Sequence, residues 1–137
     1  MEKVAVVTGT SSGIGFETAL ALAREGCYTY ATMRDTTKGD KLRELASKEN
    51  LKIIVLELDV DNEDSAKTAI QQILEQKQRI DVLVNNAGWG LWGCVEDVSI
   101  DEFRAQFETN FFSIIRLIQE VTPTMRKQGS GTIVNIS

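Results

Sequence analysis

Two short segments rich in glycine and asparagine are the parts of this sequence whose residue types and spacing could do chemistry. The first reads T-G-T-S-S-G-I-G over residues 8–15, and the second reads N-N-A-G over residues 85–88. In the first, Gly9 permits a tight turn, Gly13 lets the backbone approach a bound group, and Gly15 allows close packing of a helix on a strand. Backbone N–H groups at the start of such a helix bind phosphate. A phosphate-binding loop is therefore predicted, with a simple connecting turn as the alternative.

The elements around these segments alternate between strand and helix. The expected strands are Val4–Thr8, Tyr28–Met33, Leu51–Leu58, Asp81–Val84 and Gly131–Ser137, and the expected helices are Gly13–Glu25, Lys38–Lys48, Asn62–Lys77 and Ile100–Lys127. Apolar strands joined by helices indicate a parallel sheet covered on both faces. Right-handed crossovers then give an α/β, Rossmann-type doubly wound sheet of order 3-2-1-4-5, in one domain over residues 1–137 that stops after the fifth strand. Both motifs follow strands at the switch point, where such sheets bind ligands.

The segment 100–127 is predicted to be the longest helix. Its apolar residues form a wide stripe that includes Phe103, Phe107 and Phe111, and a stripe this wide packs on more than one neighbour. Packing on the sheet and a helix–helix contact in a homo-oligomer are both open. Pro123 is expected to kink or end this helix.

Composition narrows the classes of partner and of chemistry. The net charge of −5 argues against nucleic acid as the main partner. No apolar run approaches the roughly 20 residues that span a bilayer, and the N-terminus has no cationic leader, so no membrane association and a cytoplasmic location are expected. Cys27 and Cys94 are interpreted as reduced, buried thiols. The absence of histidine excludes a Ser-His-Asp centre within these residues, and no metal site is expected.

The end of the second expected strand bears on the choice of cofactor. In a site of this fold an acidic side chain there binds the ribose 2′-hydroxyl of NAD, whereas an arginine accommodates the 2′-phosphate of NADP. Arg34 can bind that phosphate as a charge-assisted fork, and Ser12 could add a hydroxyl donor. Asp35 could instead take the ribose hydroxyls or be solvated, and Arg34 could pair with Asp35 or Asp59 at the surface. We predict NADP(H) in preference to NAD(H).

Together these motifs resemble the short-chain dehydrogenase/reductase family, over the whole chain. The loop 8–15 matches the family pattern T-G-x-x-x-G-x-G, residues 85–88 are identical to its N-N-A-G motif, and residues 131–137 look like the strand that leads to its catalytic serine. Residues 31–35 are similar to NADP-preferring members, including some hydroxysteroid and retinol dehydrogenases. The resemblance implies a catalytic role for Asn110, an adenine-contacting pair Asp59-Val60, and a cofactor-binding set of Gly9, Ser11, Ser12, Gly13, Ile14, Gly15, Arg34, Asp59, Val60, Asn86, Ala87 and Gly88.

The resemblance also implies an activity, in which hydride transfer interconverts a carbonyl and an alcohol with NADP(H). In the family a tyrosine is the general acid and base, a lysine lowers its pKa, a serine binds the substrate oxygen, and the asparagine orders a proton-relay water. The motif Tyr-x-x-x-Lys would follow Ser137, so residues 1–137 would be the N-terminal, cofactor-binding half. Tyr30-x-x-x-Arg34 has the spacing but lies on a strand and lacks the lysine. Ser137 itself is interpreted as structural.

Two further interpretations stay open at this point. The chain could be a non-catalytic module that binds a dinucleotide, or a partner subunit completed by another chain. The free edge of the fifth strand, which has neither charge nor proline, favours the reductase. Trp89 and Trp92 follow the second motif and suggest a wall for an apolar carbonyl or alcohol substrate, with burial under a further segment as the alternative.

Overall fold

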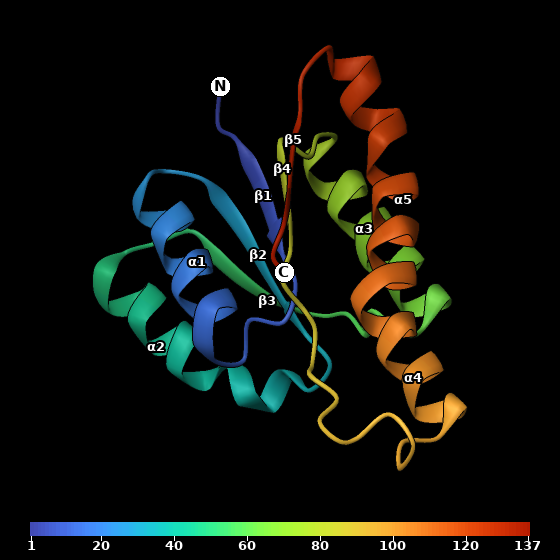
Figure 1. The fold of residues 1–137 in the computed structure, drawn as a ribbon. Coiled ribbons are helices and arrows are strands. Elements are labelled where there is room, and N and C mark those ends of the chain that lie inside the picture. Colours follow the sequence, from blue (N-terminus) through green and yellow to red (C-terminus); the bar gives the residue numbers. More distant parts are fainter.

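In the computed structural model, which describes residues 1–137, five parallel strands form one sheet of order β3-β2-β1-β4-β5 (Figure 1). The strands are β1 (Val4–Val7), β2 (Tyr28–Met33), β3 (Ile53–Glu57), β4 (Val82–Asn85) and β5 (Thr132–Asn135). The predicted fold class and strand order are confirmed. The order reverses between β1 and β4, so the carboxyl ends of these two strands flank the switch point.

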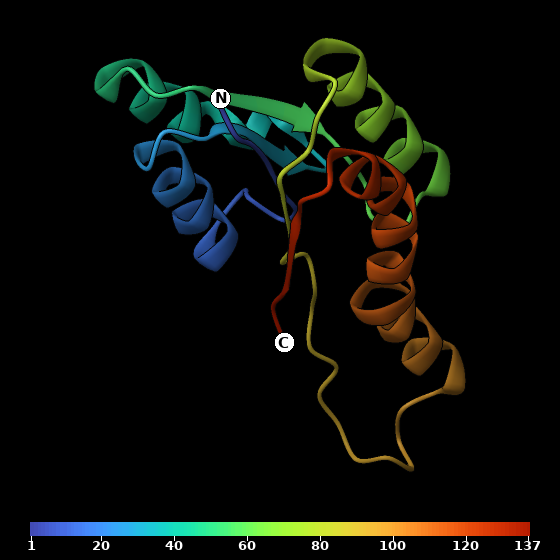
Figure 2. The ribbon, with the colours of Figure 1, turned by 90° about the horizontal axis from the view of Figure 1, so that it is seen from above.

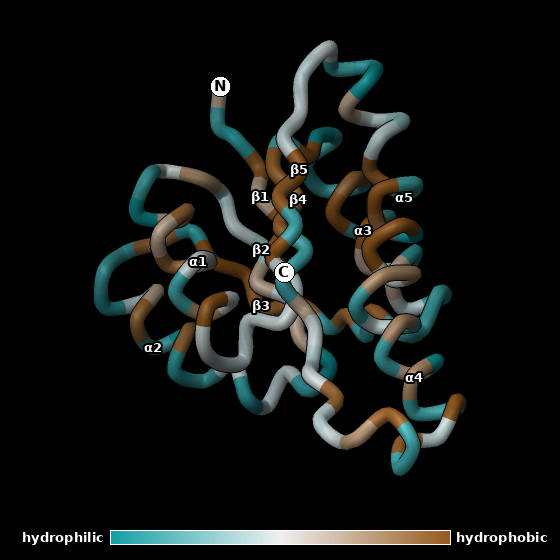
Figure 3. Tube along the Cα trace, viewed as in Figure 1, coloured by the Kyte–Doolittle hydropathy of each residue, from teal (hydrophilic) through white to brown (hydrophobic).

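Helices cover both faces of the sheet, as Figures 1 and 2 show from two directions. On one face lie α1 (Gly13–Arg24) and α2 (Asp40–Glu49), the latter preceded by the 3₁₀ turn η1 (Thr36–Gly39). On the other face lie α3 (Glu63–Lys77) and α5 (Ser113–Gln128), whereas α4 (Ile100–Phe107), which precedes α5 on the same side, extends away from the sheet. Each face has its own apolar core, and hydrophobic residues accordingly concentrate on the strands and on the inner sides of the helices (Figure 3).

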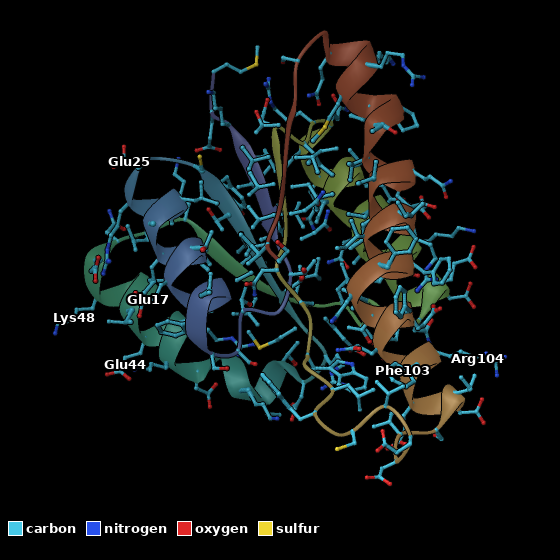
Figure 4. The ribbon with its side chains drawn as sticks, in the orientation of Figure 1. Glu17, Glu25, Glu44, Lys48, Phe103 and Arg104 are labelled. Carbon is cyan, nitrogen blue, oxygen red and sulfur yellow. The ribbon has the colours of Figure 1, made fainter.

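The outer surfaces of α1 and α2 are charged. Glu17, Glu44 and Lys48 are exposed on these helices, and Glu25 is exposed directly after α1 (Figure 4). Arg24 at the end of α1 forms a two-pronged ion pair with Glu49 at the end of α2, with both N···O distances 2.7 Å. This amphipathic division is what the helical periodicity of the sequence predicts.

The long helix predicted over residues 100–127 is interrupted. Between α4 and α5 the backbone forms a π-helical turn, η2 (Glu108–Phe112). The segment therefore consists of three helical elements, α4, η2 and α5, that follow one another without a break. Pro123 lies inside α5, which continues to Gln128, so Pro123 does not end the helix. Proline removes one backbone donor, and the packing of Val121 and Met125 in the core stabilises the turns on both sides of it.

The expectation that both thiols are buried was wrong in part: Cys27 is buried but Cys94 is exposed, and both thiols are free. The third strand, expected over Leu51–Leu58, is shorter, and it lies at the edge of the sheet, where Ile54 is 39% exposed. No helix is both long enough and apolar enough to cross a membrane.

A buried carboxylate aligns the amino ends of β1 and β4. Asp81 is 7% exposed, and its Oδ2 accepts hydrogen bonds of 2.8 Å from the Val4 N–H and from Arg79 Nε. Its Oδ1 accepts from Arg79 Nη2 at 2.5 Å. The Arg79 guanidinium, with a smaller contribution from the Val4 N–H, lowers the pKa of Asp81. Asp81 is therefore ionised in the folded protein at neutral pH and ties the first strand of the chain to the fourth.

We expect Asp81→Asn to lower the free energy of unfolding at pH 7 by about 1–3 kcal/mol, because it removes a buried, charge-assisted hydrogen-bond acceptor. A carboxylate whose pKa is lower in the folded state stabilises the fold above its unfolded-state pKa of about 3.9, and this stabilisation is lost as the pH falls through the folded-state value. The difference between wild type and variant, measured by urea unfolding, should therefore shrink below about pH 4. Asp101→Asn, at an exposed ion pair with Arg104, is the control and should change little. A difference that stays constant with pH would contradict this assignment.

Candidate functional site

A cavity of about 620 Å³ lies at the carboxyl edge of the sheet, at the switch point between β1 and β4. It brings both sequence motifs together with the ends of β2 and β3. The lining residues are Gly9, Ser11, Ser12, Met33, Arg34, Leu58, Val60, Asp61, Asn86, Ala87, Gly88, Trp89 and Thr109. Of the thirteen predicted site residues, eight line the cavity. The other five, Gly13, Ile14, Gly15, Asp59 and Asn110, are not among its lining residues.

The glycines of the loop after β1 allow it to lie directly against the segment after β4. Gly9 has φ +66°, and a β-carbon there would lie 2.8 Å from the Cα atom of Ala87. A β-carbon at Gly15 would overlap the carbonyl oxygen of Gly9 and the side-chain amide of Asn86. The start of α1 therefore packs against both motifs at a distance that only glycine permits.

Hydrogen bonds between Thr8 and Asn86 join the two motifs. The backbone N–H groups of Asn86 and Ala87 both donate to Thr8 Oγ1 at 3.0 Å. The Asn86 side chain donates to the carbonyl oxygens of Thr8 and Gly9, both at 3.1 Å. Asn86 thus fixes the ends of β1 and β4, which is more than the local turn role that an isolated asparagine would have.

The N-terminus of α1 has no side-chain cap. Its N-cap residue, Ser12, makes no capping hydrogen bond, and the first turn contains no acidic side chain. By contrast, Asn62 caps α3 and Ser99 caps α4 through their side chains. Gly13 has φ +62°, and a β-carbon there would have no heavy atom within 4 Å. Beside the Ser11–Ser12 side of the cavity, the free N–H groups of this helix form a positive, open surface that suits an anion.

At the end of β2 the two charged residues have different partners. Asp35 accepts from the backbone N–H of Thr37 at 3.0 Å and from its hydroxyl at 2.6 Å, and these hydrogen bonds lower the pKa of Asp35. Asp35 therefore caps η1 and does not line the cavity. Arg34 is exposed, lines the cavity and forms no ion pair with Asp35, Asp59 or any other carboxylate.

Beyond β3, the carboxylate that lines the cavity is Asp61. Val60, the second member of the Asp59-Val60 pair, is 6% exposed and lines the cavity. Asp59 instead accepts from the backbone N–H of Asp61 at 3.0 Å, while its own N–H donates to Ser65 Oγ at 2.9 Å. Asp59 shapes the turn, and that turn presents Asp61 to the cavity.

Asn110 lies in the π turn η2 and holds the segment that follows β4. Its Nδ2 donates to the carbonyl oxygen of Trp89 at 2.7 Å, and its Oδ1 accepts from the Trp89 N–H at 3.0 Å. One N–H and one lone pair of the amide remain available for a further partner such as water. A β-carbon at Gly88 would lie 3.0 Å from Asn110 Oδ1, so the glycine keeps this contact close.

The sequence did not identify Asp61 and Thr109 as residues of the site, although both line the cavity. Thr109 Oγ1 accepts from the Trp89 indole at 3.1 Å and donates to Asp61 at 2.7 Å. Trp89 lines the cavity, whereas Trp92 is 92% exposed and does not. The three residues are far apart in the sequence, and no motif links them. The one sequence feature that could have indicated Thr109 is its position next to Asn110, a predicted site residue.

The geometry of this edge agrees with comparisons to known proteins. A model of the short chain dehydrogenase family matches residues 3–137. The chain is 42% identical over 138 residues to an uncharacterised oxidoreductase of Bacillus subtilis, YusZ, covering 99% of this chain and 49% of that protein. It is 40% identical over 140 residues to human retinol dehydrogenase 8, covering 98% of this chain and 44% of the relative.

A solved structure shows the same likeness in three dimensions. A metagenomic short-chain oxidoreductase in complex with NADP superposes with a TM-score of 0.94 at 31% identity, covering 98% of this chain and 62% of that one. The chain therefore belongs to the short-chain dehydrogenase family of oxidoreductases. It spans about half the length of the curated relatives named above.

The packing at Gly15 gives a direct test of the loop geometry. We expect Gly15→Ala to lower the free energy of unfolding by about 1–3 kcal/mol, because its methyl group must displace the Gly9 carbonyl or the Asn86 amide. Thermal or urea unfolding measures this cost. Glu17→Ala, at an exposed site on the same helix, is the control and should be nearly neutral. An equally neutral Gly15→Ala would show that α1 does not pack this closely.

Proposed function

We propose that this chain is the cofactor-binding half of an NADP(H)-dependent short-chain oxidoreductase that interconverts a carbonyl and an alcohol by hydride transfer. The observation that supports NADP(H) most directly is Arg34, a guanidinium without an ion-pair partner at the cavity, beside an Asp35 that is engaged by Thr37. A free carboxylate at this position would instead favour NAD(H).

The residues at this edge fit a dinucleotide. The uncapped N-terminus of α1 would receive the pyrophosphate, and Gly13 leaves the space for it. Arg34 would bind the 2′-phosphate as a fork, with the Ser12 hydroxyl as a second donor. Under the same proposal, the following residues also contact the cofactor: Gly9, Ser11, Ile14, Gly15, Asp59, Val60, Asn86, Ala87 and Gly88. When bound, the nicotinamide would supply or accept the hydride.

Asn110 is the one residue of the chain to which we assign a place in the catalytic centre. Its amide already holds the Trp89 peptide group by two hydrogen bonds. Its remaining N–H and lone pair can order a water that moves a proton. The general acid and base would come from residues that follow position 137.

The substrate that we propose is an apolar carbonyl compound or alcohol. Trp92 and Val95 are 92% and 76% exposed on the segment that follows the cavity, and they would offer it an apolar surface. Relatives named retinol dehydrogenase 8 and 3-ketodihydrosphingosine reductase act on molecules of this kind by name. The free thiols of Cys27 and Cys94 support a cytoplasmic location, where thiols stay reduced.

Arg34 provides the test of this proposal. Arg34→Gln should raise the Kd for NADPH by about tenfold to a hundredfold, because a charge-assisted fork to the 2′-phosphate is lost. The Kd for NADH should change little, since NADH lacks that phosphate. Both constants can be measured by calorimetric titration, with NADPH oxidation at a range of apolar carbonyl compounds followed in parallel.

Arg104→Gln is the matched control, because Arg104 is an exposed arginine on α4 (Figure 4) that does not line the cavity. It should leave both constants unchanged. Equal weakening of NADPH and NADH by Arg34→Gln would contradict the assignment of Arg34 to the 2′-phosphate. Tight NADPH binding with no turnover of any carbonyl or alcohol, in a protein that includes the residues proposed to follow position 137, would favour a non-catalytic dinucleotide-binding module.

We also propose that the outer side of α4 and η2 forms a contact between subunits. Leu117, Val121 and Met125 of α5 are in the core, whereas Phe107, Phe111 and Phe112 are half-exposed. The wide apolar stripe therefore divides between the sheet and a surface patch, which we name the aromatic patch: Ile100, Phe107, Phe111, Phe112 and Ile115. An exposed patch of this kind is typical of an oligomer interface.

A double variant, Phe107→Glu with Phe112→Glu, should shift the protein to a smaller species in sedimentation velocity, because two charges cannot be buried unpaired in an apolar contact. Val95→Glu, at an exposed apolar residue outside the aromatic patch, is the control and should leave the assembly unchanged. A wild-type protein that is monomeric at tens of micromolar would contradict the proposed contact.

A further inference from the structure

A chain of hydrogen bonds closes one side of the cavity. The indole Nε1–H of Trp89 donates to Thr109 Oγ1 at 3.1 Å, and that hydroxyl donates to Asp61 at 2.7 Å to Oδ1 and 2.9 Å to Oδ2. A hydroxyl has one proton and can also accept, so Thr109 fits between an indole donor and a carboxylate acceptor. Thr109 is 6% exposed, and all three residues line the cavity.

The three residues come from three separate parts of the fold. Asp61 leads from β3 into α3, Trp89 follows β4, and Thr109 lies in η2 between α4 and α5. Helices α3 and α5 lie on one face of the sheet, whereas the loop that contains Ser11 and Ser12 leads into α1 on the other (Figure 2). The cavity therefore has two walls, the phosphate loop on one side and the Trp89–Thr109–Asp61 chain on the other.

The neighbours of this second wall indicate what it contacts. Leu58 and Val60 line the cavity just before Asp61, and Arg34 lies at the end of β2, the strand that pairs with β3. If Arg34 marks the 2′-phosphate, the adenosine half lies over the ends of β2 and β3. Trp89 is 41% exposed and lines the cavity, and an accessible indole suits contact with a purine ring.

We propose that Asp61 and Thr109 are positioning residues that hold the Trp89 indole against the adenosine half of the bound dinucleotide. This inference rests on the proposed function, since it requires a dinucleotide in the cavity. The indole replaces solvent on one side of the adenosine, and the carboxylate fixes the indole through the hydroxyl. Trp89 is then a contact residue whose orientation depends on two side chains that need not touch the ligand.

Thr109→Val tests the role of the hydroxyl, because it keeps the shape of the side chain and removes the donor and acceptor. It should raise the Kd for adenosine 2′,5′-bisphosphate, a probe without nicotinamide, by about fivefold to tenfold. Thr109→Ser retains the hydroxyl and should restore binding to within about twofold of wild type. Asp61→Ala should resemble Thr109→Val, and circular dichroism melts should show that each variant is folded.

Tryptophan fluorescence supplies a readout that a merely structural role would not change. The chain has two tryptophans, so a Trp92→Phe variant reports the emission of Trp89. Adenosine 2′,5′-bisphosphate should quench this emission, and a further Trp89→Phe change should remove it. Thr109→Val should reduce this quenching at saturating ligand, because the indole is no longer held. The inference would be overturned if nicotinamide mononucleotide quenched this emission and adenosine 2′,5′-bisphosphate did not. A Thr109→Val variant with unchanged Kd and unchanged quenching would overturn it as well.

These outcomes separate the two proposals. A wild-type protein that binds NADPH but shows no Trp89 quenching would overturn the inference and leave the proposed function standing. A wild-type protein that binds neither NADPH nor the bisphosphate would overturn both.

Discussion

The hydrogen bonds between Thr8 and the segment after β4 are the constraint on which the rest of this site depends. Thr8 Oγ1 satisfies two consecutive backbone N–H groups, and the Asn86 amide satisfies two backbone carbonyls of the loop after β1. These groups would otherwise lack partners at the end of a sheet, which is costly. Because they are paired with one another, the two motifs form one rigid edge, and Gly15 lets α1 approach that edge.

The distribution of hydrogen-bond partners also explains the positive charge at the cavity. Helix starts need acceptors, and three of those in this chain receive them from a side chain: Asp35 for η1, Asn62 for α3 and Ser99 for α4. The start of α1, like that of α2, has no side-chain cap, and the start of α1 adjoins the cavity. The carboxylate adjacent to Arg34 in the sequence, Asp35, caps η1 and forms no ion pair with Arg34. Two positive groups therefore face the cavity: the free N–H groups at the start of α1, after β1, and the Arg34 guanidinium, at the end of β2.

The π turn η2 connects the packing of the long helical segment with the geometry of the site. Its C-terminal continuation, α5, buries Leu117 and Val121 in the core, while α4 keeps Phe107 at the surface. The turn itself places Thr109 and Asn110 so that both reach Trp89, one by the indole and one by the peptide group. A π turn changes the angular relation between the residues before and after it, and such turns are frequent at functional sites.

The sequence by itself determined the features that depend on neighbouring residues. Periodicity predicted the alternation of strands and helices, handedness predicted the strand order, and glycine spacing predicted the loop over residues 8–15. Tertiary structure alone decided that Asp61 and not Asp59 lines the cavity, that α5 continues through Pro123, and that Trp89, Thr109 and Asp61 meet. These contacts join residues 20 and 48 positions apart. They depend on how helices are rotated and packed, and a periodic pattern does not encode that rotation once a π turn has shifted it.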